Sequence, residues 1–76
     1  MTDIEIAATA VANQDMARAR REGSVLIAQT RIGLVELFYV RNTYLLRSCE
    51  GQGMLAEGPA KKVRPVLAYL YQQVAA

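Results

Sequence analysis

A chain of 76 residues with one cysteine and no histidine must fold without an internal disulfide and without the commonest metal ligand. Domains this short bury only about 60% of the surface that the unfolded chain exposes, so their stability is marginal. Disulfides, metals or a second subunit usually reinforce them, and composition argues against the first two here. We therefore expect one small domain over residues 1–76 that holds no metal and no cofactor.

The sequence predicts a cytoplasmic protein that does not associate with membranes. The acidic residues Asp3 and Glu5 stand where a secretory signal would be basic. No unbroken apolar run approaches the ~20 residues that a membrane-spanning helix needs. The single cysteine, Cys49, fits a reducing compartment, and an apolar content of 53% suffices for a globular core.

Residues 3–22 are predicted to form a helix. Thr2 and Glu5 have the spacing of a capping box, in which each side chain accepts a backbone N–H from the other residue. The run that follows is rich in alanine, which has the highest helix propensity, and Gly23 can close the helix. Basic side chains lie near its end, where they complement the negative end of the helix dipole: Arg18, Arg20 and Arg21.

The composition changes after Gly23. Residues 24–50 are enriched in Val, Ile, Thr, Tyr and Phe, which suit a pleated and half-buried surface. We predict a three-stranded antiparallel sheet, with one turn at Gly33 and another at Arg41-Asn42. The predicted strands are residues 24–30, 34–40 and 43–49.

The second turn fixes a register. If Arg41 and Asn42 form a two-residue turn, an aromatic pair and an oppositely charged pair each come to lie across from one another. The facing pairs are then Tyr39–Tyr44, Phe38–Leu45, Leu37–Leu46 and Glu36–Arg47.

A competing interpretation makes residues 24–50 one long helix, which gives an all-α hairpin or bundle. Ser24 could cap such a helix, and polar residues recur at every seventh position: Gln29, Glu36, Thr43 and Glu50. Against it, Arg31, Arg41 and Asn42 would fall on apolar sides, and many β-branched residues would lie inside a helix. We prefer the strands, and hence an α+β fold.

Three glycines punctuate residues 51–59, which we predict to be a loop with a short extended piece at Met54-Leu55. A last helix over residues 64–74 places Pro65 in its first turn, where a missing N–H costs nothing. Its buried stripe is predicted to be Val66, Leu67, Leu70 and Val74. The predicted order is therefore an N-terminal helix, three strands and a C-terminal helix.

We expect no enzymatic activity and identify no catalytic residue. Without histidine, a Ser, Thr or Cys nucleophile lacks its usual base, so Cys49 is interpreted as a small apolar residue at a strand end. Glu50 and Glu57 flank the glycine-rich loop and are expected to be solvated. The loop itself matches neither the Walker nor the dinucleotide-binding spacing.

A basic cluster at the start of the last helix is the strongest candidate binding feature. Its members are Lys61, Lys62 and Arg64. Cations at a helix N-terminus add to the positive end of the dipole, which costs stability by about 0.3–1 kcal/mol per charge and favours an anionic partner.

The segment Gly58-Pro59-Ala60-Lys61-Lys62-Val63-Arg64 leads into that helix. With the predicted order of helix, three strands and helix, it resembles the double-stranded RNA-binding domain. The resemblance implies that Lys61 and Lys62 contact phosphates. A nucleic-acid-binding module is therefore one alternative function. In this alternative the nucleic acid directly contacts the basic cluster, joined by the basic residues at the end of the first helix.

We prefer a non-enzymatic interaction protein that binds and modulates a larger protein or protein–nucleic acid assembly. Two helices cannot cover both faces of an apolar sheet, so apolar surface should remain for a partner. Small chains of this composition are common among regulators, including phage proteins directed at host transcription or defence machinery. A structural homo-oligomer or homodimer is a further alternative. The predicted contact residues are Lys61, Lys62, Arg64, Tyr39, Tyr44, Tyr69 and Tyr71, with Arg18, Arg20 and Arg21 as a secondary basic patch.

Overall fold

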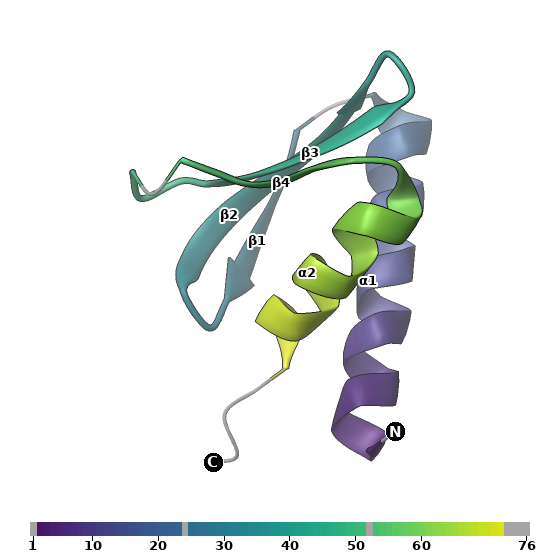
Figure 1. Ribbon diagram of the computed structural model, residues 1–76, viewed down its shortest axis with the longest axis vertical. Coiled ribbons are helices and arrows are strands. Elements are labelled where there is room, and N and C mark those ends of the chain that lie inside the picture. The colour runs from purple at the N-terminus through teal and green to yellow at the C-terminus, as the bar shows by residue number, and fades with distance from the viewer. Residues whose placement is uncertain (1, 24, 52, 73–76) are drawn as a thin grey trace.

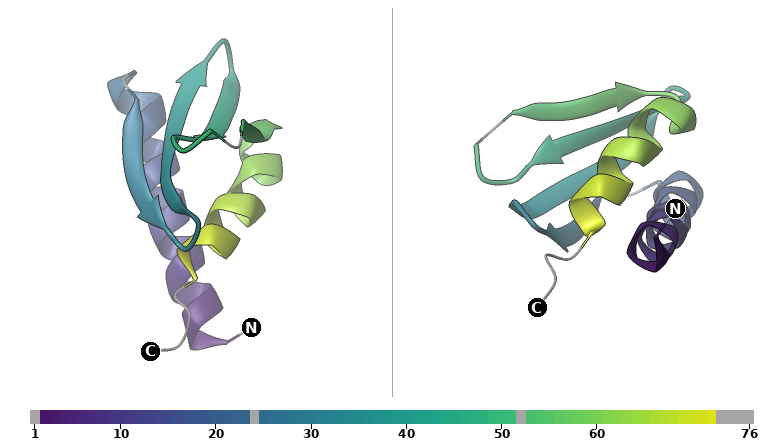
Figure 2. Two further views of the ribbon diagram at one scale, coloured as in Figure 1. Left: turned by 90° about the vertical axis from the view of Figure 1, so that its left-hand side faces the viewer. Right: turned by 60° about the horizontal axis from the view of Figure 1, so that its bottom comes forward.

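The computed structural model describes residues 2–23, 25–51 and 53–72. Over these residues a helix is followed by four strands and a second helix (Figure 1). The elements are α1 (Asp3–Glu22), β1 (Leu26–Thr30), β2 (Gly33–Val40), β3 (Thr43–Ser48), β4 (Met54–Gly58) and α2 (Ala60–Tyr71). The strands form one antiparallel sheet in the order β1-β2-β3-β4, and Figure 2 shows both helices on the same side of it. The predicted α+β class is confirmed, and the all-α alternative is wrong.

The predicted first helix is confirmed at both ends. The Thr2 hydroxyl accepts the Glu5 N–H at 3.1 Å, and the Glu5 carboxylate accepts the Thr2 N–H at 3.0 Å. The bond from the Thr2 backbone N–H to the carboxylate, and secondly the neighbouring Thr2 side chain, hold the pKa of Glu5 below its usual value. Gly23 closes the helix in the left-handed region and donates its N–H to the Ala19 carbonyl.

The β2–β3 hairpin has the register that the sequence predicts. Tyr39 lies opposite Tyr44, Glu36 lies opposite Arg47, and the two pairs between them match as well. Arg41 and Asn42 have φ values of 52° and 63°, the two left-handed residues of a type I′ turn. The strand ends differ from the prediction by one or two residues, and residue 24 lies outside the described residues.

A fourth strand replaces most of the predicted loop over residues 51–59. β4 pairs antiparallel with β3, where Leu46 lies opposite Ala56 and Arg47 lies opposite Met54. Leu55 is therefore an extra residue, and the bulge at this point lets it pack against the core. The sheet has four strands rather than the three that we predicted, so the order departs from the αβββα layout of the resemblance.

The last helix begins four residues earlier than predicted. Pro59 precedes it, and its carbonyl accepts the N–H groups of Lys62 and Val63. Pro65 is consequently the sixth residue of α2, not part of its first turn. The buried stripe is also shifted, since Val66 is only half-buried, while Val74 lies outside the described residues. The buried side chains are Val63, Leu67, Ala68 and Leu70.

The core lies between the sheet and the two helices. Its largest fully buried side chains come from the sheet and from α2: Val35, Leu37, Leu46, Val63 and Leu67. The helix α1 contributes Ala12, Met16 and Ala19, and the small alanines let α1 approach α2 closely. One face of the sheet is thus covered by both helices.

Candidate functional site

The other face of the sheet is open. Side chains alternate between the two sides of a strand, so the residues between the core positions of each strand point away from the helices. The apolar ones, which we call the open sheet face, are Ile27, Leu34, Phe38, Val40, Leu45 and Met54. Ile27 and Met54 expose 53% and 47% of their surface, and in the part of the chain that the structure describes no helix lies over them.

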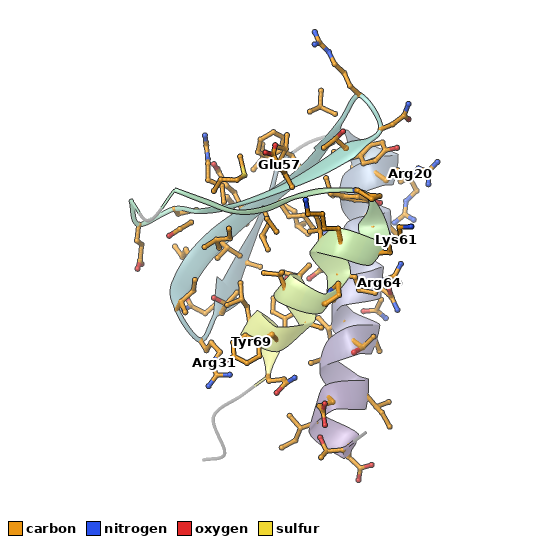
Figure 3. The ribbon with its side chains drawn as sticks, viewed as in Figure 1. Arg20, Arg31, Glu57, Lys61, Arg64 and Tyr69 are labelled. Carbon is orange, nitrogen blue, oxygen red and sulfur yellow. The ribbon has the colours of Figure 1, made fainter. Side chains whose placement is uncertain are left out.

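Three charged residues share this face. Arg47 donates its Nε–H to the Glu36 carboxylate at 2.6 Å, so these two charges neutralise each other. Glu57 lies opposite Leu45 on β4 and is exposed, with no ion-pair partner among the described residues (Figure 3). The open sheet face is therefore apolar with one surplus negative charge.

Two of the predicted tyrosine contacts lie on the covered side of the sheet. Tyr44 is only 6% exposed, and its hydroxyl donates to the Met16 carbonyl at 3.1 Å, so it belongs to the core and is removed from the predicted contact residues. Tyr39 packs against it with ring centroids 4.6 Å apart and donates its hydroxyl to the Asn42 side chain. Tyr39 is half-buried and does not reach the open sheet face.

The other two tyrosines lie on α2. Tyr69 is 57% exposed and carries the Arg31 guanidinium 4.8 Å above its ring, so it remains a candidate contact residue. Tyr71 is half-buried and donates its hydroxyl to Asp15 at 2.6 Å. Burial, followed by the hydrogen bond and charge of Asp15, raises the pKa of Tyr71 well above its usual value.

Basic residues that the sequence places in two separate clusters meet in the structure. Arg20 and Arg21 of α1 and Arg64 of α2 line one cleft of about 510 Å³ between the helices. Lys61 lies exposed on the same side of the molecule, in a row with Arg20 and Arg64 (Figure 3). We call these four residues and the hollow between them the basic cleft.

Two of the predicted basic residues do not join this cleft. Arg18 lies 4.0 Å from the Asp15 carboxylate and 3.9 Å from that of Glu22, so its charge is compensated within α1. Lys62 lies in the first turn of α2, and its aliphatic stem packs over Gly58. A side chain at Gly58 would place its Cβ 3.0 Å from Lys62 Cδ, and φ there is 136°, so glycine is required.

An apolar groove that the sequence did not reveal lies on the other side of α1. Ile4, Ala7 and Val11 line it together with Ala28 of β1 and Tyr71 of α2, around a volume of about 500 Å³. The sequence signals it only weakly, through the spacing of Ile4, Ala8 and Val11 along the predicted first helix. That pattern does not identify which side of the helix faces a strand.

No protein-family model matches the chain, and neither a curated protein nor a solved structure matches it. Cys49 follows β3 directly and is exposed rather than buried. Within residues 2–23, 25–51 and 53–72, no three His, Cys, Asp or Glu side chains are grouped to hold a metal ion. Neither described helix has the length and hydropathy that crossing a membrane requires.

Proposed function

We propose that the chain is a non-enzymatic protein-binding domain that docks onto a larger protein through its open sheet face. The observation that carries this proposal is the set of apolar side chains exposed on a face that no described helix covers. Small domains seldom leave several apolar side chains of one face in water unless a partner covers them. Every strand of the meander contributes to this face, so it is presented on a rigid, preorganised surface.

The charges on the open sheet face indicate the chemistry of the partner. The Glu36–Arg47 pair is already bonded, so covering it leaves no isolated charge. Glu57 has no such partner within the described residues and favours a Lys or Arg across the interface. A second copy would instead bring two faces with surplus negative charge together. We therefore infer a different protein with an apolar patch and a basic residue opposite Glu57.

Docking of this kind regulates by occupying a surface of the partner. No bond is made or broken, and the domain competes with whatever else uses that surface. A steric or competitive effect on a larger assembly is the simplest consequence of a preformed interface on so small a body.

Site-specific photo-crosslinking tests the proposal. A photoreactive amino acid at Leu34, on the open sheet face, should capture one protein in cells, whereas the same group at Ile6, an exposed residue of α1, should not. With the captured protein purified, Leu34→Asp should weaken binding at least about tenfold, which corresponds to about 1.4 kcal/mol. Ile6→Asp is the matched control because it places the same charge at another exposed apolar position, away from the sheet.

Two results would overturn the proposal. One is the absence of any captured protein whose direct binding depends on Leu34. The other is a stable dimer in sedimentation at micromolar concentration that Leu34→Asp dissolves, since a second copy would then be the occupant. Circular dichroism of both variants establishes that the fold is retained.

A further inference from the structure

The basic cleft is a second hollow that docking through the sheet does not use. Residues of both helices line it, so it lies on the helix side of the molecule, while the open sheet face points the other way. Asn13, Met16 and Ala17 of α1, Tyr44 of β3 and Ala60 of α2 complete its lining. Both surfaces can therefore be occupied at the same time.

No carboxylate among the described residues forms an ion pair with the arginines of the cleft, and Arg20 lies 5.5 Å from the centroid of the Tyr39 ring. Arg18 and Arg47 each pair with carboxylates, whereas no ion pair is formed by Arg20, Arg21 or Arg64 among the residues that the structure describes. The Nε–H of Arg64 is buried and, within the same residues, has no hydrogen-bond acceptor. Leaving such a donor without a partner costs free energy, and an anion in the cleft would supply an acceptor for it.

The backbone adds to the field of the cleft. Ala60, the first residue of α2, lines it, and the helix N-terminus carries the positive end of the dipole. Pro59 has no side chain that could cap the helix, and the first turn contains no acidic residue. An anion in the cleft would meet arginines from two helices and a helix N-terminus together.

The arrangement favours a polyanion over a single carboxylate. Figure 3 shows a row of basic residues along the same side of the two helices, formed by Arg20, Lys61 and Arg64. A row of positive charges matches a ligand that carries regularly repeated negative charges. Guanidinium groups bind phosphate oxygens through paired hydrogen bonds. Apart from Asn13, the rest of the lining is small or apolar or, like the Tyr44 hydroxyl, already hydrogen-bonded, so it offers little to read bases with. We propose that the basic cleft binds the phosphate backbone of a nucleic acid, without reading its sequence.

Titration of a fluorescent oligonucleotide with the purified chain tests this site. Contact with three or four phosphates should lower the logarithm of the association constant by about 2–4 for each tenfold rise in salt. Arg20→Gln and Arg64→Gln together should weaken binding about tenfold and reduce this slope by about 1–2. Arg20→Gln alone, at an exposed position, keeps the test decisive if the half-buried Arg64 proves necessary for folding.

The matched control is Arg31→Gln, which removes the same charge from an exposed position outside the cleft, above Tyr69. It should leave affinity and salt slope nearly unchanged. The proposal is overturned if Arg31→Gln weakens binding as much as Arg20→Gln, if polyglutamate displaces the oligonucleotide at equal charge, or if no binding is detected at low salt. Leu34→Asp should retain the oligonucleotide, so failure at this cleft is distinguishable from failure of docking through the sheet.

Discussion

Single hydrogen bonds connect parts of this chain that are far apart in sequence. The Tyr71 hydroxyl donates to the Asp15 carboxylate at 2.6 Å and joins the last turn of α2 to the middle of α1. Both side chains are partly withdrawn from water, so the bond is stronger than one on the open surface.

Replacing Tyr71 by Phe should therefore lower the free energy of unfolding by about 1–2 kcal/mol near neutral pH. The pKa of Tyr71 is raised in the folded state, so this stabilisation is complete below the ordinary value of 10.0. Above it the unfolded chain releases the proton that the folded chain retains, and stability is lost. Denaturant titrations should thus show the difference between wild type and Tyr71→Phe shrinking above pH 10. A difference that stays constant or grows would contradict the assignment.

The sequence identifies the tyrosines and arginines as candidate contact residues, but it does not predict the burial or the tertiary neighbours of most of them. Tyr71 is predicted to be a contact residue, yet it is half-buried and bonded to Asp15, 56 residues earlier in the chain. Tyr44 was expected to be accessible, and the Met16 carbonyl that holds it belongs to another element. Arg20 and Arg64 meet only because α1 packs on α2, and no local pattern encodes that contact.

At the scale of elements, the β2–β3 turn was predictable because its register depends on neighbouring residues alone. The turn also carries a local conformational strain, because Arg41 adopts a φ of 52°, which is unfavourable for residues that have a Cβ. Asparagine tolerates this conformation far better.

Arg41→Asn should accordingly stabilise the protein by about 0.5–1 kcal/mol, or roughly 2–8 °C in thermal midpoint for a domain of this size. Arg41→Val is the opposite control, because a β-branched side chain is least compatible with positive φ, and it should lower the midpoint. Thermal melts followed by circular dichroism measure both. Equal midpoints for the Asn and Val variants would show that the turn is not strained.

Pro65 is a second residue that lowers the stability of its own element. At the sixth position of α2 it lacks the N–H that would bond to the Lys61 carbonyl four residues earlier. Its side chain is exposed, so its removal leaves no cavity. Pro65→Ala should raise the free energy of unfolding by about 1–2 kcal/mol, after allowing for the greater freedom of the unfolded chain. A fall in denaturant midpoint would count against this account.

The same proline explains why the start of α2 was mispredicted. Proline favours a first turn, and that preference moved the predicted start to residue 64, whereas the carbonyl of Pro59 begins the helix at Ala60. β4 was missed because Gly51, Gly53 and Gly58 indicate a loop. Pairing with β3 overrides that local preference, and a bulge absorbs the irregular register.

At the scale of the whole molecule, the two faces of the sheet should respond very differently to substitution. A chain of 76 residues is expected to have a total stability of about 4–11 kcal/mol. Leu46 is fully buried against the helices, and Leu46→Ala should lower the free energy of unfolding by about 2–5 kcal/mol. That loss is enough to unfold a large fraction of a marginally stable domain.

Ile27→Thr, on the open sheet face, is the comparison. Threonine suits a strand, and the site is exposed, so stability should change by no more than about 0.5 kcal/mol. Urea titrations of the two variants measure the contrast. A loss at Ile27 comparable to that at Leu46 would mean that the face is already covered in the free protein.

The position of α1 beneath α2 also governs how the chain can fold as it is made. The ribosome releases the 20-residue α1 first and the 12-residue α2 last, with the whole meander between them (Figure 1). Each strand can pair with its neighbour as soon as the next strand has been synthesised. Met16 of α1, in contrast, stays exposed to water until the core is complete. Newly made chains that stall before α2 should therefore be bound by chaperones or degraded. The helix α1, although it is synthesised before α2, packs into the core only after α2 has been made.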